Sequence, residues 1–145
     1  MILEDLNGVE LGPIYSRVHL GRNGSEGFMS CELEISIHIP SLSQFLIIDS
    51  FYADPGNWEN STALLSVRTA DKVMNSKLTV SSGKLLRPEV IYGDPLGKVF
   101  NLRLRKSRRN PDNKEGDNLL IQTDSGKSIE IYGSDFLPFN MVRIS

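Results

Sequence analysis

A thiol and an imidazole lie on one stretch of the chain, the segment from Phe28 to Pro40. Cys31 and His38 are the residue types that a thiol nucleophile and its general base require. Their positions are an odd number of residues apart, so in a regular β-strand the two side chains point to opposite faces. Cys31 falls among the apolar positions of that stretch. This placement predicts a buried, inert thiol.

Two other patterns resemble catalytic motifs. The run Ser125–Ser128 matches the end of a phosphate-binding loop, but Ile121 occupies the place of the glycine that begins that motif. The run therefore predicts a hairpin turn. Asp49, Asp54 and Asp71 would act as acid and base only if the fold brought them together. We assign no catalytic residue, and a small hydrolase is the least favoured hypothesis.

Metal-ligating patterns are absent from the sequence. His19 and His38 are the two histidines and Cys31 is the one cysteine. No pair of histidine, cysteine or carboxylate residues has the spacing of a zinc site, so neither a metal nor a cofactor is expected. A single cysteine excludes an internal disulfide, which is typical of a protein in a reducing compartment.

The stretch from Phe28 to Pro40 also carries an acidic face. Glu32 and Glu34 alternate with apolar residues, so their carboxylates share one face about 7 Å apart. One interpretation is a solvated face, or one paired with Arg or Lys on a neighbouring strand. The other is a docking surface for a basic protein. In that second hypothesis the partner-binding residues are Glu26, Glu32, Glu34 and His38.

A short basic segment contrasts with the rest of the chain. Five of the sixteen basic residues lie within seven positions: Arg103, Arg105, Lys106, Arg108 and Arg109. The remaining residues comprise 11 basic and 18 acidic side chains, a net charge of −7. The segment is either an edge strand protected by charge or a set of phosphate contacts for nucleic acid. Against the second hypothesis, the body of the chain repels a polyanion and no aromatic residues interleave the arginines.

The element that must position the acidic face is a strand from Met29 to Ile39. Its apolar residues recur at every second position, a period of two that favours a β-strand. One continuous ribbon of roughly 40 Å is expected, unless a bulge bends it. The residues that face the core on this expectation are Met29, Cys31, Leu33, Ile35, Ile37 and Ile39.

Further strands are separated by turn-forming residues. Alternation from Lys98 to Lys106 points Phe100 toward the core and Val99 away from it. Ser41 to Phe51 favours a short helix because of its capping-box spacing, while its β-branched residues favour a strand. Glycine-rich residues 21–27 predict a hairpin loop, and polar residues 110–117 predict a mobile loop. The other expected strands cover residues 14–20, 63–69, 77–82, 89–92, 118–124, 127–132 and 141–144.

These patterns define the fold class. The sequence predicts a mainly β protein, an antiparallel β-sandwich or partly open barrel of about seven to nine strands with one or two short helices. Its 145 residues fit a single domain, 1–145. The first residues lack the features of a signal peptide, and no apolar run is long enough to span a membrane. A cytoplasmic protein without membrane contact is expected.

The chain's whole character resembles a known family. The Met29–Ile39 strand with its acidic face and the strand-rich part from Lys98 to Ile144 resemble the immunity proteins of bacterial contact-dependent growth-inhibition toxin systems. The resemblance implies a non-enzymatic inhibitor that binds a cognate, basic toxin domain, often a nuclease, and occludes its active or substrate-binding surface. The alternative is a nucleic-acid-binding β-barrel that uses the basic segment from Arg103 to Arg109.

Overall fold

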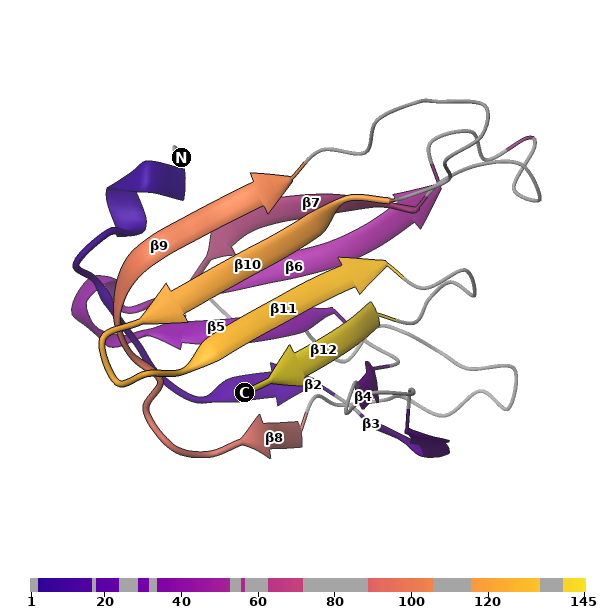
Figure 1. The fold of residues 1–145 in the computed structure, drawn as a ribbon, viewed down its shortest axis with the longest axis horizontal. Helices are drawn as coiled ribbons and strands as arrows, with labels where there is room; N and C mark the ends of the chain where they lie inside the picture. The colour runs from indigo at the N-terminus through magenta and orange to yellow at the C-terminus, as the bar shows by residue number, and fades with distance from the viewer. Residues whose placement is uncertain are drawn as a thin grey trace.

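Two antiparallel β-sheets lie face to face in this protein (Figure 1). The computed structural model describes residues 3–16, 18–23, 29–31, 34–52, 56, 63–71, 89–105, 116–133 and 140–145. The helical elements whose bounds are described are short 3₁₀ turns, η1 (Leu3–Leu6) and η3 (Pro40–Leu42). The predicted fold class, mainly β with an antiparallel sandwich or partly open barrel, is confirmed.

One sheet has seven strands and contains the C-terminal part of the chain. Four of its neighbouring strands, β9 to β12, follow one another in sequence and pair antiparallel. In sheet order the strands are β1 (Glu10–Leu11), β9 (Gly97–Arg105), β10 (Asn118–Thr123), β11 (Ser128–Gly133), β12 (Asn140–Ile144), β4 (Met29–Cys31) and β3 (Val18–Asn23).

The other sheet has five strands and lies behind the first in Figure 1. In sheet order the strands are β7 (Ala63–Ala70), β6 (Gln44–Tyr52), β5 (Ile35–Ile39), β2 (Ile14–Ser16) and β8 (Glu89–Tyr92). The described residues contain twelve strands, more than the seven to nine expected. The excess arises partly because two predicted ribbons are each divided between the sheets.

The chain from Ile14 to Ile39 contains a hairpin whose arms pass between the two sheets. Strand β2 pairs with β5 in the five-stranded sheet, whereas β3 pairs with β4 in the seven-stranded sheet. The prediction of one continuous ribbon over Met29–Ile39 is therefore wrong: its start belongs to one sheet and its end to the other. Strands that switch sheets form a corner of a sandwich, and they let side chains on both segments reach the same core.

The core fills the space between the sheets. Cys31, Ile35, Ile37 and Ile39 are fully buried, as the alternation predicts. Ser36 has the opposite parity and is also fully buried, so the polar face of this stretch is not solvated there. Other core residues come from both sheets and include Leu11, Ile14, Leu46, Ile48, Leu65, Leu119, Ile121, Ile129, Ile131 and Val142.

A β-bulge corrects the predicted orientation of β9. Asn101 lies opposite Gln122 but Val99 lies opposite Thr123, so β9 has one extra residue, Phe100. As a result Val99 is buried and Phe100 is 61% exposed, the reverse of the prediction. Two residues of a bulged strand face one residue of its partner, which shifts the inward parity by one.

Most of the segment after Pro40 forms a strand and not a helix. Residues 44–52 form strand β6, so the helix favoured for Ser41–Phe51 is wrong. The β-branched pair Ile47-Ile48 at the centre of β6 is fully buried, and β-branched residues pack well on a pleated surface. The strands expected over residues 63–69, 89–92, 118–124, 127–132 and 141–144 are present. The strand expected at 77–82 and most of the 110–117 loop lie outside the described residues.

Candidate functional site

The outer face of the five-stranded sheet brings charged side chains together. The register pairs Ile35 with Ile48, so Glu34 and Asp49 come next to each other just beyond that pair. Arg68 lies on β7, the strand that pairs with β6. Its Nη2 donates to Glu34 Oε2 at 3.2 Å, an ion pair in which the glutamate side chain is 14% exposed and the arginine 42%. A basic side chain therefore pairs with Glu34, but it comes from β7, two strands from β5, rather than from the neighbouring strand that was expected.

The surroundings of Glu34 change its acidity. Burial raises the pKa of the Glu34 carboxyl above its ordinary value, and the adjacent Asp49 carboxylate raises it further. The Arg68 guanidinium opposes both effects. Asp49 is fixed from the other side, because the Ser50 N–H donates to its Oδ1 at 2.8 Å. The site thus holds two adjacent carboxyl groups, and one of them, Glu34, pairs with an arginine.

Three rings lie on the same outer face. The Phe45 ring packs edge-on against Tyr15, with centroids 5.9 Å apart and planes at 77°, and lies 4.9 Å from the His38 ring. His38 and Phe45 are direct cross-strand partners. The Gly12 N–H donates to the His38 carbonyl oxygen at 2.7 Å. A Cβ on Gly12 would come within 3.2 Å of the imidazole, so a glycine there suits the position of the His38 ring.

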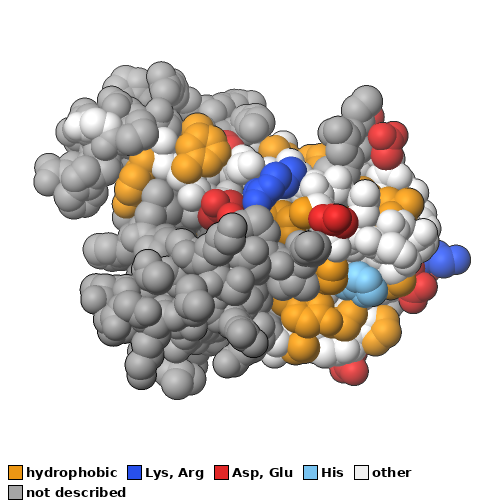
Figure 2. Space-filling view, turned by 180° about the vertical axis from the view of Figure 1, so that it is seen from behind, with side chains coloured by type: hydrophobic (Ala, Val, Ile, Leu, Met, Phe, Trp, Pro, Cys, Tyr) orange, Lys and Arg blue, Asp and Glu red, His pale blue; other side chains and the backbone are white. Residues whose placement is uncertain are grey.

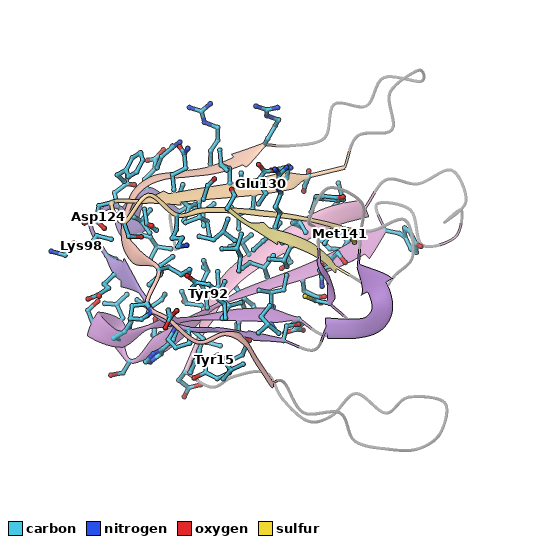
Figure 3. All side chains as sticks on the ribbon, turned by 60° about the horizontal axis from the view of Figure 1, so that its bottom comes forward. Tyr15, Tyr92, Lys98, Asp124, Glu130 and Met141 are labelled. Atoms are coloured by element: carbon cyan, nitrogen blue, oxygen red, sulfur yellow. The ribbon has the colours of Figure 1, made fainter. Side chains whose placement is uncertain are left out.

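We call the set Tyr15, Glu34, His38, Phe45, Asp49 and Arg68 the aromatic–acidic face. Figure 2 looks onto this side of the molecule and shows hydrophobic, acidic and basic side chains together with a histidine. In Figure 3, Tyr15 lies on the outer side of the five-stranded sheet, away from the seven-stranded sheet. All six side chains belong to β2, β5, β6 and β7 or directly precede β5. A β-sheet therefore holds them in a fixed arrangement.

The predicted partner-binding residues are only partly described. Glu34 and His38 share this face, as their parity predicts, whereas Glu26 and Glu32 lie outside the described residues. The sequence analysis missed Phe45 because the segment containing it was interpreted as a helix. An alternation of Phe45, Ile47 and Asp49 against Leu46, Ile48 and Ser50 was the signal that could have found it.

The two described arginines of the basic segment lie on the opposite side of the sandwich. Arg103 and Arg105 are exposed on β9 of the seven-stranded sheet. Together with Asn118, Leu120 and Glu130 they line a surface hollow of about 180 Å³, which we call the arginine hollow. Figure 3 labels Glu130 on the seven-stranded sheet. Lys106, Arg108 and Arg109 lie outside the described residues.

The remaining candidate residues have structural surroundings. Cys31 is fully buried, and burial raises the pKa of its thiol to about 11 against the opposing effect of a Ser16 hydrogen bond. The predicted burial of the thiol is confirmed. Asp71 is exposed, and Asp54 lies outside the described residues. Within the part of the chain that is described, no three His, Cys, Asp or Glu side chains gather as a metal site.

Comparisons with known proteins give no family for this chain. No protein-family model, no curated protein and no solved structure matches it. The described residues also include no helix with the length and apolar character needed to cross a bilayer.

Proposed function

We propose that this protein is an immunity-type inhibitor that acts in the cytoplasm and binds a basic toxin domain, with a nuclease as the expected class. The toxin docks on the aromatic–acidic face, and its active or substrate-binding surface becomes occluded. One observation carries the proposal: a ring cluster around Phe45 and the Glu34–Asp49 carboxyl pair belong to one face of one sheet, on either side of the fully buried pair Ser36 and Ile47.

The two parts of this face contribute differently to binding. Aromatic residues and arginine are the side chains that most often dominate interface energy, and aromatic rings bury a large area with few lost rotamers. Tyr15, His38 and Phe45 are half-buried, so part of each ring is still accessible. The carboxylates add steering toward a basic partner and disfavour acidic ones. Because these groups lie on paired strands, docking costs little ordering entropy.

The test uses a candidate toxin domain, which the proposal expects a neighbouring gene to encode. Cells that express this domain stop growing, and co-expression of the protein restores growth. In calorimetry the two purified proteins bind in a one-to-one complex, with an affinity that falls as salt rises. Growth that stays arrested, together with no measurable binding, would overturn the proposed function.

A pair of double variants locates the interface. Glu34→Gln with Asp49→Asn removes two acidic groups from the face and weakens binding by about tenfold or more, which is about 1.4 kcal/mol. The matched control is Glu4→Gln with Asp5→Asn, which removes two exposed acidic groups from η1. This control stays within about twofold of the wild type. Equal losses in both double variants would mean that net charge, rather than this face, governs binding.

A further inference from the structure

On the outer face of the seven-stranded sheet, polar and basic residues occupy every second position of β9 from Asn101 onward. Asn101, Arg103 and Arg105 are successive outward residues of β9. Side chains at every second position of a strand lie about 7 Å apart on one face. The two guanidiniums can therefore meet two successive anionic groups of an extended chain.

Strand β10 supplies the neighbouring row of the same face. Gln122 lies opposite Asn101, Leu120 opposite Arg103 and Asn118 opposite Arg105. The Asn101 Nδ2 donates to Gln122 Oε1 at 2.8 Å, so these amides are already oriented. The two arginines of β9 therefore lie beside a row of amide and apolar side chains on β10.

The bulge adds an aromatic ring to this track. Phe100 and Asn101 both face the single residue Gln122, so the bulge brings Phe100 to the outward side of β9. Phe100 is 61% exposed, a large hydrophobic side chain open to solvent. An exposed ring beside arginines is the combination with which proteins bind single-stranded nucleic acid: the ring stacks on a base and the cations contact phosphates. The sequence pattern alone had placed Phe100 inside the core.

We propose that this face, formed by Phe100, Arg103 and Arg105 of β9 with Asn118 and Leu120 of β10, binds single-stranded nucleic acid. An acidic protein segment would match the arginines equally well but has no use for the stacking ring. Glu130 also lines the hollow and repels a phosphate, so it limits affinity. The site lies on the opposite side of the sandwich from the aromatic–acidic face and is independent of the inhibitor function.

The test is the binding of a fluorescein-labelled oligothymidylate to the whole protein, measured by anisotropy from low to moderate salt. We expect saturable binding whose logarithmic affinity falls linearly with the logarithm of salt concentration. The double variant Arg103→Gln/Arg105→Gln loses about tenfold or more in affinity. Its salt slope becomes shallower by about 1.4, the value for two phosphate contacts on a single strand. Glu130→Gln binds more tightly than the wild type.

Matched variants separate this site from a general charge effect. Lys98→Gln removes a positive charge from an exposed residue of the same strand, outside the hollow, and stays within about twofold. Phe100→Leu weakens binding of the oligonucleotide but leaves binding of a labelled poly-aspartate peptide unchanged. The site is refuted by absence of oligonucleotide binding at low salt, or by a loss of affinity in Lys98→Gln as large as that in the double variant Arg103→Gln/Arg105→Gln. Tighter binding of poly-aspartate than of the oligonucleotide would assign the face to an acidic protein instead.

Discussion

The carboxyl group of Glu34 is half-buried, and it lies next to the Asp49 carboxyl group and the Arg68 guanidinium. Its ion pair with Arg68 offsets only part of the combined effect of burial and the Asp49 carboxylate, since the pKa of Glu34 is still raised. A raised pKa means that the native state binds a proton more readily than the unfolded chain. Protonation of Glu34 and folding are therefore linked.

This linkage gives a prediction for stability against pH. Glu34 makes a contribution that is fully present below its ordinary pKa of 4.5 and is lost as pH rises through the raised native value. The free energy of unfolding of the wild type should therefore fall relative to that of Glu34→Gln as pH increases above 4.5. Urea denaturation of both proteins at several pH values measures this difference.

A control excludes effects of a general charge change. Glu10→Gln alters an exposed acid of β1 and should give a stability curve parallel to that of the wild type. If the wild-type and Glu34→Gln curves are parallel throughout this pH range, the Glu34 carboxyl group titrates normally in the native state. Its protonation would then not be linked to folding.

The start of β9 is held against the turn between β10 and β11. The Lys98 N–H donates to Asp124 Oδ1 at 2.8 Å, and the Thr123 hydroxyl donates to the Leu96 carbonyl oxygen at 2.6 Å. Gly97, between these contacts, has φ of +105°. A Cβ there would lie 2.8 Å from Asp124 Oδ1, so this element requires glycine for both conformation and space. Figure 3 shows Lys98 and Asp124 near each other at one end of the sheet.

Two glycine substitutions test this element. Gly97→Ala should destabilise the protein by about 2–4 kcal/mol, because backbone strain adds to the displacement of the turn. Gly126→Ala is the matched control: φ is +84° but nothing lies within 4 Å of the added Cβ, so about 1–2 kcal/mol is expected. Thermal and urea unfolding of both variants give the values. Similar losses in the two would show that the contact with the turn is unimportant.

Strands with clear alternation and flanking turn residues were predictable from the sequence, because both signals are local. The hairpin of β10 and β11 and the strand β7 are examples. The bulge at Phe100 and the passage of the long hairpin between sheets were not predictable, since each depends on pairing with strands distant in sequence. The residues of the aromatic–acidic face were likewise predictable only where the signal was local. Parity placed Glu34 and His38 on one face, but Arg68 joins them only through a third strand.

At the scale of the whole molecule, Asp117 connects the two sheets. It directly precedes β10 of the seven-stranded sheet and is 1% exposed. Its Oδ2 accepts a hydrogen bond at 3.0 Å from the N–H of Leu65, on the edge strand β7 of the five-stranded sheet. The sequence predicted a mobile loop for residues 110–117, and at Asp117 the prediction is wrong, because the carboxylate satisfies a backbone donor of an edge strand.

Removal of this connection should weaken the whole fold. Asp117→Ala leaves the buried Leu65 N–H without its acceptor and should cost about 1–3 kcal/mol of unfolding free energy. Asp117→Asn retains an acceptor oxygen and should cost less. Asp94→Ala, at an exposed aspartate, should change stability by less than about 0.5 kcal/mol. Urea denaturation measures these losses. The dependence of the unfolding free energy on urea concentration should be the same in all variants. Equal effects of Asp117→Ala and Asp94→Ala would contradict this role.

The two outer faces of the sandwich differ in character, and the inhibitor hypothesis assigns partner binding to one of them. The most direct test is an NMR titration of the isotope-labelled protein with the candidate toxin domain that the inhibitor hypothesis expects a neighbouring gene to encode. The account predicts that the largest amide shifts fall in Glu34–His38, Phe45–Asp49 and the β7 residues around Arg68, while β9 and β10 change little. Shifts concentrated on β9 to β12, or no shifts at concentrations that protect cells, would contradict it.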